Sequence, residues 1–371
     1  MTQSLSPDPS TDATEAIAAE DHELEDALAD WFRARGSALI GFSGGVDSAY
    51  LACVAVDAIG RDNVLAVIGR SASYPSAQWE RAREVAAQFD VPVLEVSTDE
   101  INDPRYAANP TNRCYFCKTE LWDTLAPLAR ERGFAVVVDG TNADDLSDHR
   151  PGARAADEHG VRSPLAELGF TKAAIRHLSR ARGIPTWSQP ASPCLSSRIP
   201  YGTAVTIDRL RQVERAEAAL RSAGVTGDLR VRYHSDLARV EVASHTLTGW
   251  LDREGRTAID AAVRAGGFDR VAIDLRGFRS GSLNVLGGVV AEPLVRARSS
   301  FVTGAGDAAG LTDALRDLGV CARVEARERL AVLDCSEEIT PLFRDAAVRT
   351  TAIDVARRHG FTHVAIAIQR A

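Results

Sequence analysis

Four short, almost continuous apolar runs recur in the first 140 residues, and helical segments separate them. A strand that is apolar on both faces is typical of a parallel sheet with helices on either side. The pattern therefore predicts an α/β domain with a doubly wound parallel sheet, whose ligand lies beyond the carboxyl ends of the strands. The expected strands cover residues 37–42, 63–69, 91–97 and 134–140.

The pattern changes after about residue 185. From there the periodicity predicts a smaller α+β domain with helices over 207–224 and 253–267 and strands over 229–234, 238–244 and 268–277. The C-terminal segment repeats this order at a shift of 93 residues, so that Arg230 meets Arg323 and Phe268 meets Phe361. We interpret this as an internal duplication with a degenerate second copy.

These patterns divide the chain into four expected parts. The first is a disordered tail rich in Ser, Pro, Asp and Thr, followed by a helix that begins near Leu24. The expected limits are 1–22 for the tail, 23–190 for the α/β domain, 191–285 for a loop and the α+β domain, and 286–371 for a linker and the second copy.

Composition excludes several classes of protein. The 371 residues include no apolar run near the roughly 20 that a membrane helix needs. The first residues have neither a basic region nor an apolar region of a secretory signal, so we expect a cytoplasmic protein. The net charge of −8 argues against a large nucleic-acid footprint.

The strongest local motif is Ser43-Gly44-Gly45-Val46-Asp47-Ser48, which follows the first strand and begins a helix. Two glycines let the backbone turn tightly, so that N–H groups and the helix N-terminus converge on an anion. The Ser43 and Ser48 hydroxyls can bind phosphate oxygens, and Asp47 can hold Mg²⁺ against them. The motif resembles the loop of the N-type ATP pyrophosphatases, which release AMP and pyrophosphate from ATP while adenylating a substrate.

Two further segments fit that resemblance. The turn Gly140–Asp145 follows the fourth strand, and its Asn142 and Asp144 are expected beside the nucleotide and the metal. Ser71, after the second strand, is a further expected contact of the nucleotide.

Five other motifs narrow the resemblance to the LarE family, over about residues 24–285. The resemblance implies that ATP adenylates a carboxylate of pyridinium-3,5-biscarboxylic acid mononucleotide, and that sulfur then displaces AMP to leave a thiocarboxylate. It also implies a homo-oligomer. The motifs are Asn109-Pro110-x-x-Arg113-Cys114-Tyr115-x-Cys117-Lys118, Asp139–Asp144, Arg150-Pro151-Gly152, Ser163-Pro164-Leu165 and Pro193-Cys194-Leu195-Ser196-Ser197-Arg198-Ile199-Pro200-Tyr201-Gly202.

The cysteines leave the source of sulfur open. Cys194 occupies the family's sulfur position, and in some members that lone cysteine gives up its own sulfur. Here Cys114 and Cys117 are also present. The resemblance to a three-cysteine branch implies a [4Fe–4S] cluster on all three, with one iron left for an extra sulfide. Zinc and a bystander C-x-x-C beside a sacrificial Cys194 remain alternatives.

Arginine and acidic side chains suit an anionic substrate. Arg198, Arg230 and Arg232 can bind phosphate or carboxylate groups bidentately, and Ser197 can donate a hydrogen bond. Glu217 and Glu241 match family positions near the substrate or a metal. Each of these arginines and glutamates could equally be an ordinary surface charge.

Of the 43 basic residues only Lys118 and Lys172 are lysines. Lys118 follows Cys117 and is expected to lower a thiolate pKa or to face a phosphate. Lys172 begins a helix and either reaches the ATP phosphates or only caps that helix.

Three other functions compete with sulfur insertion into a small nucleotide. One is cluster-dependent tRNA thiolation, against which the negative charge argues. Another is a non-catalytic nucleotide-binding module, which the retained Asp47 and cysteines disfavour. The last is an amide-forming synthetase of the same superfamily, which leaves the three cysteines unexplained.

Overall fold

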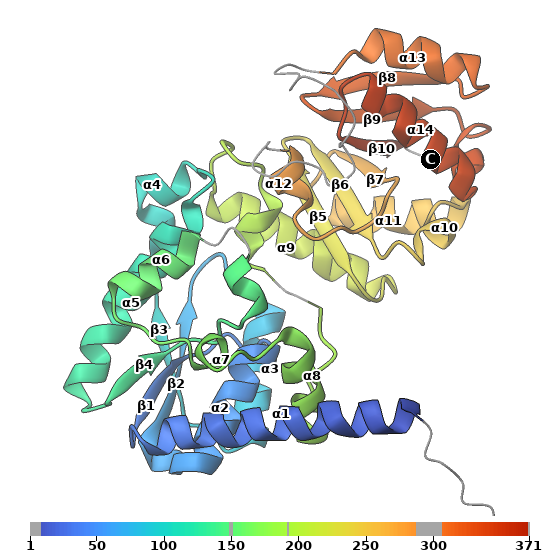
Figure 1. Ribbon diagram of the computed structural model, residues 1–371. Coiled ribbons are helices and arrows are strands. Elements are labelled where there is room, and N and C mark those ends of the chain that lie inside the picture. Colours follow the sequence, from blue (N-terminus) through green and yellow to red (C-terminus); the bar gives the residue numbers. More distant parts are fainter. Residues whose placement is uncertain (1–8, 148–150, 191–192, 287–305, 370–371) are drawn as a thin grey trace, which may run out of the picture. The chain divides into compact units, whose positions relative to one another are not determined.

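The computed structural model describes residues 9–147, 151–190, 193–286 and 306–369 (Figure 1). They form two compact units. Unit 1 runs to Ala107 and continues over Asn112–Pro193, whereas unit 2 comprises Ala108–Thr111 and the chain from Cys194 onward. Among the described residues, no helix is long and apolar enough to cross a membrane.

Unit 1 contains a parallel four-stranded sheet in the order β3-β2-β1-β4. Its central strand β1 pairs with β2 on one side and with β4 on the other. The predicted doubly wound parallel sheet is confirmed. Its strands are β1 (Ala38–Gly41), β2 (Val64–Arg70), β3 (Val93–Ser97) and β4 (Val136–Val138).

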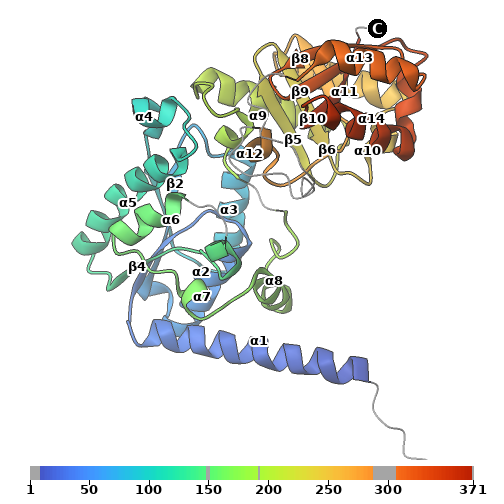
Figure 2. The same ribbon diagram turned by 45° about the horizontal axis from the view of Figure 1, so that its top comes forward.

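Helices cover both faces of this sheet because neighbouring strand residues point to opposite sides. Ile40 packs into one core with α1, α2, α3 and α8, and Leu39 packs into the other core with α5 and α6. Figure 2 shows the long α1 alongside α2 and α8. The helices are α1 (Pro9–Arg33), α2 (Val46–Ile59), α3 (Ser76–Gln88), α5 (Arg113–Glu131), α6 (Pro151–Glu158) and α8 (Lys172–Ala181), with the short α4 (Pro104–Ala107), α7 (Pro164–Glu167), η1 (Arg61–Asn63), η2 (Glu100–Asn102) and η3 (Asp144–Ser147).

Two helices begin earlier than the sequence pattern indicated. Helix α1 begins at Pro9, so the part of the expected tail from residue 9 is helical, because Ala and Glu are strong helix formers and the helix gains from packing Leu28 and Phe32 in the core. Residues 1–8 lie outside the described residues. The sequence pattern indicates the second of these helices only from near Lys118, whereas α5 begins at Arg113, which places the C-x-x-C motif on a helix.

Unit 2 contains one six-stranded mixed sheet in the order β5-β6-β7-β10-β9-β8. A shift of 93 residues carries β5 onto β8, β6 onto β9 and α11 onto α14, end to end. We call the elements from α9 to β7 the first copy and those from α13 to β10 the second copy. The strands are β5 (Leu229–His234), β6 (Leu237–Val242), β7 (Arg270–Asp274), β8 (Ala322–Arg327), β9 (Leu330–Cys335) and β10 (His363–Ile368).

The two copies meet in the middle of that sheet, where β7 and β10 pair antiparallel. The expected parts 191–285 and 286–371 therefore contribute the two halves of a single sheet. The helical elements of unit 2 are η4 (Leu195–Arg198), α9 (Ile207–Ser222), α10 (Leu247–Trp250), α11 (Arg253–Ala265), α12 (Ser282–Leu286), α13 (Ala308–Asp317), η5 (Thr340–Arg344) and α14 (Ala346–Arg358).

Candidate functional site

The glycine-rich loop connects β1 to α2 at the carboxyl edge of the unit 1 sheet. Gly44 has a φ of +65°, and a Cβ there would lie 2.4 Å from the Cβ of Ala82 on α3. Gly45 caps α2 without any side-chain hydrogen bond to the first helical turn. The loop therefore needs glycine at position 44 and leaves main-chain N–H groups directed toward an anion.

Hydroxyl groups fix the shape of this loop. The Ser43 and Ser48 hydroxyls hydrogen-bond to one another over 3.1 Å, and the Ser43 N–H donates to Ser48 Oγ over 3.2 Å. The Ser43 carbonyl accepts from Tyr74 Oη at 2.8 Å and from Gln78 Nε2 at 3.0 Å. Tyr74 and Gln78 could not be recognised from the sequence, because their only signal is a tyrosine and a glutamine flanking the start of a helix after β2.

Asp47 lies at the start of α2 and forms an ion pair with Lys172. Lys172 Nζ contacts Asp47 Oδ2. Thr171, and not Lys172, caps α8 by accepting from the Ala174 N–H at 3.2 Å. Asp47 Oδ1 is buried and has no hydrogen-bond partner among the described residues. A carboxylate oxygen so placed fits a Mg²⁺ ion, which prefers carboxylate and phosphate oxygens.

The turn after β4 packs directly on the glycine-rich loop. A Cβ at Gly140 would lie 3.0 Å from the Ser48 nitrogen. Asp144 Oδ2 accepts from the Lys172 main-chain N–H at 2.8 Å. Asn142 is buried, and its Oδ1 accepts from the Asp145 N–H at 3.2 Å. The predicted Asp144 thus lies beside Lys172, whereas the side-chain oxygen of Asn142 shapes its own turn.

Ser71 follows β2 at the same edge of the sheet. Its hydroxyl hydrogen-bonds to that of Ser73 at 2.9 Å, and Ser73 donates to the buried Glu100 at 2.9 Å. Unit 1 therefore brings predicted residues from the ends of β1, β2 and β4 to one edge, as parallel α/β sheets do with nucleotide ligands.

The C-x-x-C motif occupies the first turns of α5. Cys114 is exposed and Cys117 is half-buried, and their spacing places both on one face of the helix. Lys118 Nζ lies 5.1 Å from the centre of the Trp122 ring, and its Cγ would be 2.9 Å from a Cβ at Gly152 of α6. Arg150, the charged residue of the Arg150-Pro151-Gly152 motif, lies outside the described residues.

In unit 2, Cys194 precedes η4 and is held by a buried arginine. Arg198 Nη1 donates to the Cys194 carbonyl and to Ser197 Oγ, both at 3.0 Å. Arg198 Nε and Nη2 donate to the two carboxylate oxygens of Glu217, each at 3.0 Å. The same carboxylate accepts from the Val231 N–H at 2.9 Å. The cysteine-bearing turn is therefore tied to α9 and β5.

A second buried arginine holds the other side of the turn. Arg232 Nη1 donates to the Ser197 carbonyl at 3.0 Å, and its Nε and Nη2 donate to Glu241 Oε2. Ser282 Oγ donates to Glu241 Oε1 at 2.6 Å. Although burial alone would raise it, the positive charges of Arg232 and Arg239 hold the pKa of Glu241 below its usual value.

Arg239 and Asp274 extend this network, and the sequence analysis named neither. Arg239 is fully buried and pairs with Glu241 Oε1 at 3.0 Å and with Asp274. Burial and the nearby Glu241 raise the pKa of Asp274. A charged residue at an apolar-face position of a strand was the available signal.

Arg230 lies two residues before Arg232, on the same face of β5, and is also buried. Burial and the neighbouring Arg198 lower its pKa to about 10, because a second positive charge disfavours the first. Arginines from η4 and β5 thus concentrate positive charge beside the Cys194 turn. Such a cluster suits a ligand with phosphate or carboxylate groups.

Asn109 lies in the short segment Ala108–Thr111, which belongs to unit 2 although the chain on either side of it belongs to unit 1. Its Nδ2 donates to the carbonyls of Pro200 at 2.7 Å and Thr203 at 2.9 Å, and its carbonyl accepts from the Gly202 N–H. Asn109 is fully buried with a φ of +55°, a conformation that Asn adopts more readily than most residues. It therefore fixes the Pro-Tyr-Gly end of the motif.

The three proposed cluster ligands are divided between the units, with Cys114 and Cys117 in unit 1 and Cys194 in unit 2. Over the described ranges, no three side chains of His, Cys, Asp or Glu form a group that could hold a metal ion. Ligation of a cluster by these cysteines stays a prediction.

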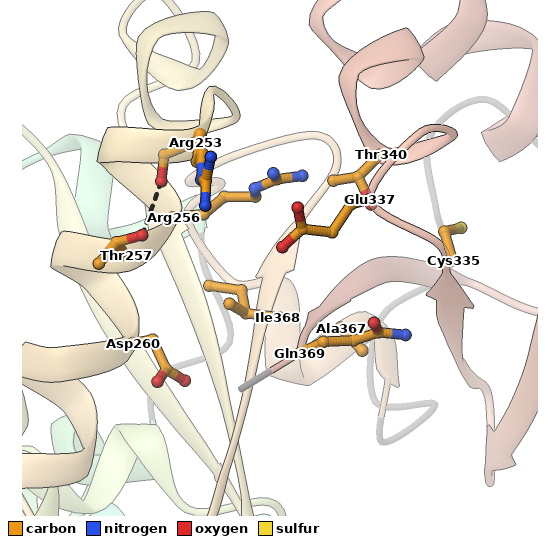
Figure 3. A pocket seen from close by; sticks show the side chains of 10 residues that line it. All are labelled: Arg253, Arg256, Thr257, Asp260, Cys335, Glu337, Thr340, Ala367, Ile368 and Gln369. Atoms are coloured by element: carbon orange, nitrogen blue, oxygen red, sulfur yellow. Dashed lines mark hydrogen bonds between the residues drawn. The ribbon is translucent and has the colours of Figure 1, made fainter. Parts of the chain in front are cut away.

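One cavity of about 50 Å³ lies in unit 2, away from every predicted site residue (Figure 3). It lies between α11 of the first copy and the ends of β9 and β10 of the second, so it marks the junction between the copies. Its lining includes Arg253, Arg256, Thr257, Cys335 and Glu337.

Comparisons with known proteins show similarity to one protein family and to several individual proteins. The NAD synthase family matches residues 22–113, which include the glycine-rich loop. An uncharacterized protein of Synechocystis is 44% identical over 257 residues, covering 69% of this chain and 95% of that protein. The pyridinium-3,5-bisthiocarboxylic acid mononucleotide synthase of Lactiplantibacillus plantarum is 36% identical over 245 residues, covering 66% of this chain and 88% of the synthase. A glutamine-dependent NAD(+) synthetase of Aquifex aeolicus is 35% identical over only 80 residues, or 21% of this chain and 14% of the synthetase.

Proposed function

The chain belongs to the LarE family, that of the pyridinium-3,5-bisthiocarboxylic acid mononucleotide synthase, and we propose that it inserts sulfur into carboxylates of a pyridinium mononucleotide at the expense of ATP. The single observation that carries this proposal is the Cys194 turn. Two buried arginines, Arg198 and Arg232, hold the cysteine-bearing turn, and together with Arg230 they place three arginine side chains beside it.

The first step is adenylation. A substrate carboxylate oxygen attacks the α-phosphorus of ATP, and the bond to pyrophosphate breaks. The main-chain N–H groups of the glycine-rich loop and the hydroxyls of Ser43 and Ser48 hold the phosphates, and Lys172 neutralises part of their charge. A Mg²⁺ ion on Asp47 would supply further neutralisation of the phosphate oxygens.

The second step replaces oxygen by sulfur. A sulfur nucleophile attacks the acyl carbon, and AMP leaves with the carboxylate oxygen, so that a thiocarboxylate remains. Arg198, Arg230 and Arg232 bind the anionic groups of the substrate, and Ser197 donates a hydrogen bond to it. Two rounds convert both carboxylates of the substrate.

Two sources of the sulfur fit the cysteines. Cys194 can attack through its own Sγ, after which loss of a proton from Cα and cleavage of Cβ–Sγ leave dehydroalanine. Alternatively, a [4Fe–4S] cluster held by Cys114, Cys117 and Cys194 would present a sulfide on the iron that no cysteine ligates. We favour the cluster, because Cys114 and Cys117 lie on one face of α5 at its start, with Cys114 exposed and Cys117 half-buried.

Pyrophosphate release tests the function itself. Purified protein with ATP and Mg²⁺ is expected to release pyrophosphate only when pyridinium-3,5-biscarboxylic acid mononucleotide is added, and Asp47→Asn to abolish that release. Release that does not depend on this substrate, or tight, salt-dependent binding of tRNA, contradicts the proposal. In the second case the tRNA thiolase takes its place.

The absorption spectrum and the mass of the protein after turnover distinguish the two sources of sulfur. A broad brown absorbance of anaerobically purified protein, lost in Cys114→Ala, supports the cluster. A colourless protein whose mass falls by one H₂S after turnover supports a sacrificial Cys194. Lys118 and Lys172 are tested by Lys→Arg, because arginine keeps the charge but not the compact ammonium donor.

We further propose a cytoplasmic homo-oligomer. Size-exclusion chromatography with light scattering tests the assembly, and a monomer at micromolar concentration contradicts it.

A further inference from the structure

The pairing of β7 with β10 has the register of a symmetric dimer. Each β10 residue can be replaced by its first-copy counterpart, which lies 93 positions earlier in the chain. Position 271 then pairs with 275, position 272 with 274, and position 273 with itself, so the pairing is symmetric about Ile273. A strand that meets its own counterpart in this way forms an isologous contact. The observed pairs are Val271 with Ile368, Ala272 with Ala367, Ile273 with Ile366, and Asp274 with Ala365.

A second contact at the junction obeys the same symmetry. Helix α10 contacts η5, and the shift of 93 places the start of α10 on the start of η5. Thr248 Oγ1 donates to the Arg344 carbonyl at 3.5 Å across this contact. Two separate parts of the junction thus join an element to its own counterpart.

The side chains of β7 are also compatible with a second β7. Val271 and Ile273 are buried on one face of the sheet, where Ile273 lies opposite Ile366. On the other face Asp274 lies opposite Ala365, and in a pairing of two first copies it would lie opposite Ala272. The residue type facing Asp274 is alanine in both cases, so the strand can pair with itself.

One charge contact favours the second copy over another first copy. Arg270 contacts Glu325 through two N–O pairs of 3.2 and 2.5 Å. The first-copy counterpart of Glu325 is Arg232, which would offer Arg270 no anionic partner. Tethering in one chain adds a high effective concentration. Pairing within the chain is therefore preferred.

We propose that the β7 edge of the first copy is a self-association surface, whose partner is the first copy of another chain. In the intact chain, the second copy occupies this surface. Without its second copy, the chain pairs with another chain through β7. This proposal is independent of the proposed function, because its test needs neither ATP nor substrate.

The test begins with the full chain, which carries a protease site inserted within 287–305 and a tag on the C-terminal side. After cleavage, the C-terminal piece is captured through its tag and removed. The urea concentration used for this step is too low to change the circular dichroism of the protein. Ile273→Cys marks the symmetry axis, and Val271→Cys is the matched control. The accessible cysteines Cys114, Cys117, Cys194 and Cys321 are replaced by serine in all samples.

Oxidation then reports the register. Two cysteines introduced at position 273 lie directly opposite one another and fall within the Cα separation of a disulfide, whereas two introduced at position 271 would be offset by about 13 Å along the strands. We expect at least tenfold more disulfide-linked dimer of the N-terminal piece with Ile273→Cys than with Val271→Cys. Adding back the C-terminal piece should suppress it.

The positive control is the uncleaved chain with Ile273→Cys and Ile366→Cys, in which a disulfide should link β7 to β10 within one chain. An N-terminal piece that stays monomeric, aggregates or links equally well through position 271 overturns the proposal. So does a C-terminal piece that never separates below the unfolding transition, because the edge is then never available to a second chain.

Discussion

The two copies in unit 2 share the order and register of their strands but differ in where they keep their charges. The first copy buries Arg232, Arg239, Glu241 and Asp274 in one connected network. At the corresponding positions the second copy has Glu325, Val332, Asp334 and Ala367. The second copy also has no counterpart of the Cys194 turn.

The difference separates what makes the fold from what makes the site. Apolar residues at alternate strand positions are present in both copies, as in Val231 and Val324, and they suffice for the sheet. Arg230 is 5% exposed, whereas the side chain of its counterpart Arg323 is 82% exposed. Buried charge is costly, so its presence in one copy only points to use there.

The largest expected effect separates Cys194, in the turn that precedes the first copy, from Cys321 in the second copy. Cys194→Ala should lower formation of the thiocarboxylate by more than about a thousandfold, because the sulfur position is lost, while pyrophosphate release in the first turnover changes less than about twofold. Cys321→Ala, in the second copy, should change neither. Quantified product and pyrophosphate decide this, and sulfur product from Cys194→Ala would assign the sulfur to another residue.

Stability should show the next largest difference. Arg239→Met leaves the buried Asp274 without its ion-pair partner and leaves Glu241 with Arg232 alone, and we expect a loss of about 3–5 kcal/mol in the free energy of unfolding. Arg323→Ala removes an arginine from an exposed ion pair with Asp334 and should cost no more than about 1 kcal/mol. Urea denaturation measures both, and equal losses would remove the distinction between the copies.

Each copy also contributes one histidine that is shielded from water, so the pH response should be shared. His363 is fully buried and His234 is half-buried. Burial, followed by repulsion from Arg239, lowers the pKa of both histidines well below the usual value. The unfolded chain then binds protons that the folded chain does not, so stability falls as pH drops below about 6.5, by about 1.4 kcal/mol per pH unit for each histidine.

His234→Gln and His363→Gln should each remove one such contribution between pH 6.5 and 5.5, as measured by urea denaturation. His159 contributes with the opposite sign, because hydrogen bonds to Asp123 and Ala155 outweigh its burial and raise its pKa. It is present in both variants and so cancels in the comparison. A slope that neither variant changes would contradict the assignment.

The smallest effect is expected at the junction between the copies. Arg270→Ala removes the partly exposed pair with Glu325 and should lower the free energy of unfolding by at most about 1 kcal/mol. The loss should shrink in 1 M salt, where charges are screened. A larger, salt-independent loss would mean that Arg270 acts through packing.

Much of the site could be predicted from the sequence, because its motifs are local. Ser43, Gly44 and Asp47 lie in one loop, and the strand before it placed that loop at the sheet edge. Tyr74, Gln78 and Arg239 could not be found in this way. Their roles depend on contacts with residues far away in the chain, and their own surroundings in sequence are ordinary for a helix start or a strand.

The sequence by itself determined the alternation of strands and helices, the phosphate-binding loop and the shift of 93 residues between the copies. Apolar periodicity and glycine requirements are written into consecutive residues, so they can be read without a fold. Only the tertiary structure decided that Lys172 pairs with Asp47, that Asn109 fixes the Pro200 turn, and that the two copies complete a single sheet through β7 and β10. These depend on which distant backbone and side-chain groups meet, and only the folded chain brings them together.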